Sequence, residues 1–167
     1  AIYSSIGAGF KNQITVNSSA SFVGAGRSNH IKDSHTSAIV GGRAQDIFAS
    51  ERSFIGGGND NRISSSEQSV IAGGTANWIR ENQASAIAGG SSNYIFTGSS
   101  NSFIGGGNSN QILWSSDSVI IGGVNNVISS SVSSSILGGG YNHTAGSSNV
   151  YILGSKISAS QKNTTFT

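Results

Sequence analysis

The sequence repeats one phrase every 16 residues, and this repeat limits the possible fold more than any other feature. Residues 53–63 read SFIGGGNDNRI, and residues 69–79 read SVIAGGTANWI. Such a repeat has to be interpreted first, because it decides the whole architecture. Aligned on the first serine of each phrase, the units begin at Ser4, Ser21, Ser37, Ser53, Ser69, Ser85, Ser102, Ser118, Ser134 and Val150. The steps that end at Ser21 and Ser102 contain 17 residues, and the tenth unit is incomplete.

We number each unit from 1 to 16, so that its first serine is position 1. Position 3 is isoleucine or valine in every unit, and position 11 is isoleucine in every full unit but the last, which has Thr144. Position 9 is asparagine in every full unit but one, where Gln45 stands, and position 6 is glycine nine times running. These two columns include Gly42, Gly58, Gly74, Gly90, Gly107 and Gly123 at position 6, and Asn61, Asn77, Asn93 and Asn110 at position 9.

Sixteen residues are too few for a helical repeat, which needs more than about thirty, but they suffice for two short strands and two turns. Isoleucine favours strands, whereas glycine, asparagine and serine favour turns. We therefore expect an all-β solenoid of about ten 16-residue coils, stacked at ~4.8 Å into a rod roughly 45–50 Å long. Position 6 is expected to need a conformation or a closeness that only glycine allows. The asparagines are expected to form an amide-to-amide ladder.

The two strands of a coil differ in their outward faces. In the second strand, position 11 is apolar and position 10 is mixed, whereas in the first strand positions 2, 3 and 4 are all largely apolar. A strand that is apolar on both faces is buried on both faces, so we expect this face to meet a partner chain. A flanking domain packed on a monomeric solenoid is the alternative. The expected inter-chain contacts are Phe54, Phe103, Val119, Ile121 and Leu137.

The phrases SFIGGGNDNRI, SFIGGGNSNQI and SVIIGGVNNVI resemble the head repeats of trimeric autotransporter adhesins of the YadA type and related repeats of phage, viral and predatory-bacterial surface fibres. The resemblance covers nearly the whole chain. It implies a left-handed β-roll, a parallel homotrimer and an extracellular place on a cell or virion surface. The repeat domain would span 1–148, and 149–167 would be a final partial coil and exit segment. The 16-residue period differs from the 14 residues common in bacterial adhesin heads and favours the fibre-type variants.

The chain shows no sign of catalytic or cofactor chemistry. Its seven acidic residues do not repeat in register, and no pair is placed for general acid–base work. His30 and Asp46 share position 10 in adjacent coils and could hydrogen-bond, but the abundance of serine makes a Ser-His-Asp arrangement uninformative. We expect that the chain is not an enzyme and that it binds no metal and no cofactor. A net charge of +2 is too weak to indicate binding of nucleic acid. The chain has no run of 18 apolar residues, so we expect no membrane insertion by this segment.

One outward region is a candidate binding site for a cell-surface glycan or an acidic polymer. Its aromatic rings suit the flat faces of sugars, and its arginines suit anionic groups. It consists of Arg62, Trp78, Arg80, Tyr94, Phe96 and Trp114, at positions 10, 12 and 13 of neighbouring coils. The alternative is that these rings stack as cross-strand pairs that stabilise the roll, or pack against a neighbouring subunit.

The sequence therefore predicts a segment of a trimeric surface fibre or adhesin that projects or makes contact with a target cell. A purely structural spacer is the first alternative. A polysaccharide-degrading enzyme of the tailspike kind and an ice-binding solenoid are the others, although no outward column is rich in threonine.

Overall fold

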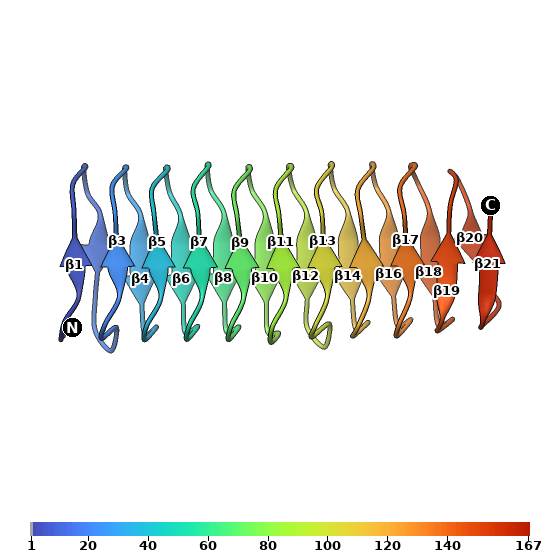
Figure 1. Ribbon diagram of the computed structural model, residues 1–167, viewed down its shortest axis with the longest axis horizontal. Helices are drawn as coiled ribbons and strands as arrows, with labels where there is room; N and C mark the ends of the chain where they lie inside the picture. Colours follow the sequence, from blue (N-terminus) through green and yellow to red (C-terminus); the bar gives the residue numbers. More distant parts are fainter. Residues whose placement is uncertain (1) are drawn as a thin grey trace.

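The computed structural model describes residues 2–167 and has strands but no helix in that range. The chain winds into a β-solenoid of about ten coils, in which each coil contributes one strand to each of two parallel sheets. Figure 1 shows the coils side by side along a rod, with the N-terminus at one end and the C-terminus at the other. The all-β solenoid expected from the repeat is confirmed.

The odd-numbered strands form an 11-stranded sheet and the even-numbered strands a 10-stranded sheet. The first sheet contains β1 (Ser5–Ile6), β3 (Phe22–Val23), β5 (Ala38–Ile39), β7 (Phe54–Ile55), β9 (Val70–Ile71), β11 (Ala86–Ile87), β13 (Phe103–Ile104), β15 (Val119–Ile120), β17 (Ser135–Ile136), β19 (Val150–Ile152) and β21 (Thr164–Phe166). The second contains β2 (Gln13–Ile14), β4 (His30–Lys32), β6 (Asp46–Phe48), β8 (Arg62–Ser64), β10 (Trp78–Arg80), β12 (Tyr94–Phe96), β14 (Gln111–Leu113), β16 (Val127–Ser129), β18 (His143–Ala145) and β20 (Ser158–Ala159).

The strand register follows the sequence repeat, including its two irregular steps. Ile79 pairs with Ile63 on one side and Ile95 on the other, one unit away in each direction. The 17-residue steps keep this register, because Ile87 still pairs with Ile104 across the second of them. Segment 149–167 continues the same stack, since β19 pairs with β17 and β21 pairs with β19.

The core consists of the two isoleucine columns, as the repeat predicts. The side chains at positions 3 and 11 are fully buried in every coil from Val23 to Ile136. Ile6 in the first coil is 44% exposed, because no earlier coil covers it. Each isoleucine is thus buried between the coils before and after it, and the rod depends on stacking along its length.

The asparagine column is buried, but its hydrogen bonds differ from the expected ladder. The Nδ2 group of Asn77 donates to the carbonyl of Gly73 in its own coil (3.0 Å) and to that of Gly90 in the next (3.1 Å). Its Oδ1 accepts the backbone N–H of Asn93 at 3.0 Å. The amide-to-amide ladder is therefore wrong as a general description, because each side chain bonds mainly to backbone; a side-chain contact is added at Asn110.

Gln45 shows why asparagine suits this column. Its Oε1 accepts the N–H of Asn61 at 3.0 Å, as an asparagine oxygen would. Its longer side chain leaves the buried Nε2 without a hydrogen-bond partner. The glutamine thus keeps one of the three bonds and loses the two to the turn carbonyls.

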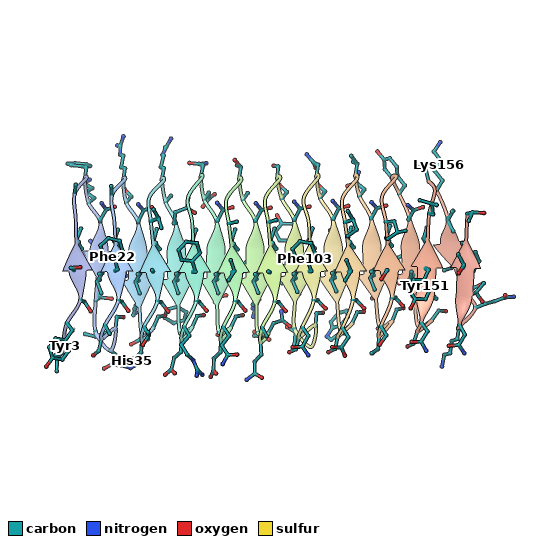
Figure 2. All side chains as sticks on the ribbon, viewed as in Figure 1. Tyr3, Phe22, His35, Phe103, Tyr151 and Lys156 are labelled. Atoms are coloured by element: carbon teal, nitrogen blue, oxygen red, sulfur yellow. The ribbon has the colours of Figure 1, made fainter. Side chains whose placement is uncertain are left out.

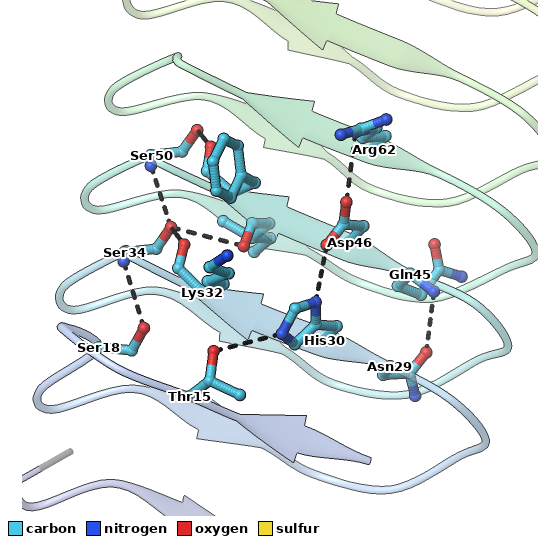
Figure 3. A network of polar contacts seen from close by, with 12 residues as sticks. Thr15, Ser18, Asn29, His30, Lys32, Ser34, Gln45, Asp46, Ser50 and Arg62 are labelled. Atoms are coloured by element: carbon cyan, nitrogen blue, oxygen red, sulfur yellow. Dashed lines mark hydrogen bonds and ion pairs between the residues drawn. The ribbon is translucent and has the colours of Figure 1, made fainter. Parts of the chain in front are cut away.

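Two serine columns, at position 1 and near position 14, complete the inner hydrogen bonds. Ser34 Oγ donates to the carbonyl of Lys32 at 2.7 Å and accepts the N–H of Ser50 at 3.0 Å. Figure 3 shows the Ser18–Ser34–Ser50 part of this column at one end of the strands and the Asn29–Gln45 contact at the other end. The hydroxyls form hydrogen bonds with the buried backbone groups where the chain turns, so these groups stay paired. The extra residue of each 17-residue step precedes this column, at the turn before Ser18 and Ser99.

Glycine is required at position 6, as the sequence predicts. Gly74 has a φ of +93°, and a Cβ there would meet the carbonyl oxygen of Gly90 and lie 2.5 Å from Asn77 Nδ2. The space that a side chain would need is therefore occupied by the hydrogen bond between the asparagine and the next coil. The preceding Gly73 has an ordinary φ and only one atom, 3.9 Å away, near its Cβ position.

Three other turn positions adopt the left-handed conformation without glycine, which the repeat did not predict. In one coil these are Ala76 (φ 54°), Glu81 (φ 55°) and Ala84 (φ 50°), at positions 8, 13 and 16. Thr36, a β-branched residue for which this conformation is rare, also has a φ of 54°. Each costs on the order of 1–2 kcal/mol, so the turns are held by their hydrogen bonds and not by local preference.

The outer face of the odd-strand sheet is apolar and exposed. Phe54 (37%), Phe103 (36%), Ile121 (51%) and Leu137 (50%) are exposed, and Val119 is half-buried. In Figure 2, Phe22, Phe103 and Tyr151 lie along this sheet. All five residues expected at an inter-chain contact thus lie on this one face of the rod.

The glycine pair gives a matched test of the corner. We expect Gly74→Ala to destabilise the protein by about 1–3 kcal/mol from backbone conformation alone, with the loss of the asparagine bond added. Gly73→Ala is expected to be neutral or stabilising by about 0.4–1 kcal/mol. Denaturant unfolding of both variants measures the difference, and equal effects would contradict the assigned corner.

Candidate functional site

The candidate site lies on the outward wall of the even-strand sheet, where side chains at positions 10 and 12 point away from the core. The register places Trp78 beside Arg62 and Tyr94, and Arg80 beside Ser64. Alternation along a strand explains this, because the residue between the two outward positions, such as Ile79, is the buried isoleucine. The structure therefore brings together five of the six residues of the predicted site.

Three aromatic rings form the centre of this wall. Trp78 meets Phe96 edge-to-face, with ring centroids 5.3 Å apart and planes at 80°. Phe96 also stacks on Tyr94, with centroids 5.4 Å apart and an interplanar angle of 11°. These distances are typical of favourable aromatic pairs. We call Trp78, Tyr94 and Phe96 the aromatic cluster.

Two arginines flank the indole of Trp78. The guanidinium carbons of Arg62 and Arg80 lie 5.3 Å and 5.8 Å from its ring centroid. Both distances are within the range of a cation–π interaction. The ring thus has one cation near it from the preceding coil and one from its own strand.

Two shallow hollows flank the Arg62–Trp78 ridge. The first, of about 200 Å³, is lined by Asp60, Arg62, Ala76, Asn77, Trp78 and Tyr94. The second, of about 290 Å³, is lined by Phe48, Arg62, Ser64, Ser65, Trp78, Arg80 and Glu81. Each is smaller than the ~300–1,000 Å³ of most ligand pockets. Phe48, Ser64 and Asp60 were not among the predicted site residues, although their positions in the 16-residue register place them there.

Several polar groups of this wall are already paired within the chain. The indole Nε1 of Trp78 donates to Ser64 Oγ at 3.1 Å. Arg62 Nε lies 3.2 Å from Asp46 Oδ2. Arg80 contacts Glu81 Oε1 through Nε at 2.9 Å and through its terminal nitrogen at 2.8 Å. These contacts fix the orientation of both arginines and of the indole.

The pKa of the Glu81 carboxyl is shifted by two neighbouring side chains. The hydroxyl of Thr97 donates to Glu81 Oε2 at 2.8 Å, and Arg80 adds a hydrogen bond and a positive charge. Together they lower the pKa of the Glu81 carboxyl from its ordinary value, with Thr97 as the largest cause. Hydrogen bonds to the ionised form favour that form.

Trp114 is not part of the aromatic cluster, although its backbone N–H donates to the carbonyl of Thr97, the residue after Phe96, at 3.1 Å. It stands at the turn after β14, with a φ of 49°, and its side chain is close to Gly98. The indole is 60% exposed, and within residues 2–167 it makes no ring contact with the aromatic cluster. The repeat period predicts that Trp114 is near the site because it gives the distance along the rod. It does not predict the direction in which the turn points the ring.

A chain of polar side chains leads from this wall toward the N-terminal end. Asp46 Oδ1 lies 3.4 Å from His30 Nδ1, and His30 Nε2 lies 3.3 Å from Thr15 Oγ1 (Figure 3). The contact of His30 with Asp46 was predicted, whereas that with Thr15 was not. The order Thr-His-Asp matches a hydrolytic triad. However, the N–H groups of Gln13 and Thr15 donate to Asn29 and Ile31 in the ladder, so neither can stabilise an oxyanion.

Two further features are absent from residues 2–167. In this range no three His, Cys, Asp or Glu side chains gather as metal ligands. No helix in the same range has the length and apolar character needed to cross a bilayer.

No protein-family model matches the chain, and no curated protein matches it significantly.

The hydrogen bond at Glu81 predicts a pH dependence. Because its pKa is lower in the folded chain, ionised Glu81 stabilises the fold above the pKa of the unfolded chain, and this contribution is lost as the pH falls through the folded pKa. We expect Thr97→Val to raise the pKa of Glu81 toward its ordinary value, as measured by NMR titration of the carboxyl. Thr75→Val, an exposed threonine elsewhere, is expected to leave it unchanged. An unshifted pKa in Thr97→Val would show that the hydroxyl has no such role.

Proposed function

We propose that this chain is a segment of a trimeric surface fibre that carries contact between two surfaces and has no catalytic activity. The observation that carries the proposal is the contrast between the two outer faces of one rod. The odd-strand face is apolar and exposed, and the even-strand wall is polar and aromatic. A rod with one face to bury and another to display suits a bundle of identical chains.

The proposed trimer buries the odd-strand face of each chain against the others. Exposed phenylalanines and aliphatic side chains recur along this face, and an extended exposed apolar patch often marks a surface that another chain covers. Position 4 is glycine or alanine in six units, including Gly56, Ala72 and Gly105, which lets parallel rods approach closely. The three-fold axis and the left-handed winding come from the resemblance to YadA-type heads and belong to this proposal.

The even-strand wall is the proposed place of contact with a glycan or acidic polymer. A saccharide ring can occupy a shallow hollow on either side of Trp78, against the indole edge and Tyr94. The terminal nitrogens of Arg62, which Asp46 leaves free, can bond a carboxylate or sulfate. The hollows are small, so one site binds weakly, and three copies per trimer raise the apparent affinity through avidity.

A purely structural spacer is the second candidate, and a specific observation favours it. The indole N–H of Trp78 already donates to Ser64 Oγ, Arg80 is paired with Glu81, and the rings pack on one another. Such a wall can serve to hold successive coils together. The two candidates differ in whether the wall binds anything outside the chain.

The enzyme and ice-binding alternatives have less support. The hollows hold no pair of carboxylates at a cleft, since Asp60 and Glu81 line different hollows. The outward position-10 column contains glutamine, histidine, aspartate, arginine and aromatic residues in place of threonine rows.

The trimer proposal predicts the mass of the particle. Light scattering on the purified chain is expected to give about three times 16.9 kDa. Leu137→Asp is expected to weaken assembly by about 2 kcal/mol or more per chain, because it loses the burial of a leucine and places a charge on the apolar face. Val132→Asp makes a similar change at an exposed turn position and is expected to keep the trimer. A folded, stable monomer of the unmodified chain would refute the assembly.

The binding proposal predicts a loss that is confined to the wall. Wild-type protein is expected to bind members of a glycan array or whole target cells, and Trp78→Ala/Tyr94→Ala is expected to lose this binding while it stays folded and trimeric. Tyr141→Ala removes an exposed ring on a distant turn and is expected to bind like wild type. If wild type binds nothing, or if the double variant binds equally well, the segment is a spacer.

A further inference from the structure

A row of cations lies on the turn between the odd and even strands in the first three coils, away from the aromatic cluster. Position 7 forms its own parallel ladder, in which Phe10 bridges to Arg27, Arg27 to Arg43 and Arg43 to Asn59. The two arginines therefore stand in register, one strand spacing of ~4.8 Å apart. Lys11 follows Phe10 at position 8, and all three cationic residues are exposed. We call Lys11, Arg27 and Arg43 the cationic row.

The phenylalanine at the start of this ladder orders two of the cations. Lys11 Nζ lies 5.3 Å from the centroid of the Phe10 ring, and the guanidinium carbon of Arg27 lies 5.7 Å from it. The backbone beneath is held as well, because Arg27 N donates to Gly42 O and Ala44 N donates to Arg27 O, both at 2.9 Å. The charges are thus positioned before any ligand arrives.

Within residues 2–167, no carboxylate forms an ion pair with this row, although Asp60 lies beside Arg43, whose carbonyl accepts the Asp60 N–H at 2.9 Å. Within residues 2–167, the ion pairs use Asp46, Glu67 and Glu81, and all of them involve cations outside the row. Like charges opposite each other on neighbouring strands are destabilising. The same ladder holds neutral residues in later coils, such as Thr75 and Ser91. The fold therefore does not need arginine at this position.

We propose that the cationic row binds a linear anionic polysaccharide, with sulfate or uronate groups, laid along the rod axis. An extended chain with one anion on each sugar ring presents its charges at a spacing similar to that of the coils. Arginine guanidinium groups bind carboxylate and sulfate oxygens in a bidentate manner. Duplex nucleic acid fits less well, because three cations in single file offer fewer than the ~6–10 phosphate contacts of typical DNA-binding proteins.

This site is independent of the proposed glycan site around Trp78. The row belongs to the turn after the odd strands in coils one to three, whereas the aromatic cluster belongs to β10 and β12. Asp60, at position 8 of the fourth coil, marks the end of the row. Failure of either proposal therefore leaves the other standing.

The test measures binding of a size-defined heparin oligosaccharide by isothermal titration calorimetry at several NaCl concentrations. The variant is Arg27→Asn/Arg43→Asn, because the ladder already holds asparagine at Asn59. The control is Lys156→Gln/Lys162→Gln, which removes the same charge from exposed positions near the other end. We expect about tenfold or more weaker binding in the arginine variant, with a shallower salt dependence, and an unchanged affinity in the control.

Circular dichroism and the unfolding temperature check that both double variants keep the fold. Equal losses in the two variants would reduce the effect to net charge and overturn the proposal. Wild-type affinity for heparin no higher than for neutral dextran would overturn it as well. Affinity for a DNA duplex of equal charge that matches or exceeds that for heparin would replace the polysaccharide with nucleic acid as the ligand class.

Discussion

The fold depends on one corner of the coil, where an asparagine side chain bonds to two turns at once. Asn77 Nδ2 donates to the carbonyl of Gly73 in its own coil and to that of Gly90 in the next, and its oxygen accepts the next asparagine's N–H. The bond to Gly90 occupies the space in which a Cβ of Gly74 would lie. Buried polar groups are tolerated because they are paired. The position-6 glycine and the position-9 asparagine therefore depend on each other. The isoleucine columns stack in register because this corner repeats along the rod.

The sequence predicts this architecture well because most of the constraints are periodic. Isoleucine at positions 3 and 11 and glycine at position 6 could be assigned from spacing alone, and the structure places them as expected. The direction of hydrogen bonds could not be predicted, because an asparagine column is compatible with amide-to-amide and amide-to-backbone bonding. The left-handed conformation of Thr36 was also hidden, since its residue type argues against it and neighbouring coils impose it.

The candidate site was predictable to the extent that it follows the strand register. Trp78, Tyr94 and Phe96 lie on adjacent paired strands, so their contact follows from the period. Trp114 stands on a turn, where the backbone conformation sets the direction of the ring, and counting coils could not supply that. The partners that occupy the polar groups, Ser64 and Glu81, depend on side-chain geometry and appear only in the structure.

Exchange of asparagine side-chain amide protons in deuterated water, followed by NMR, tests whether this corner is closed. Asn77 is fully buried with both Nδ2 bonds made, whereas Asn59 stands exposed on the position-7 ladder of a neighbouring coil. If the corner is closed, the side-chain amide of Asn77 exchanges about a hundredfold or more slowly than that of Asn59, because exchange requires the coil to open. Equal exchange rates at the two residues would show that the asparagine does not close the corner.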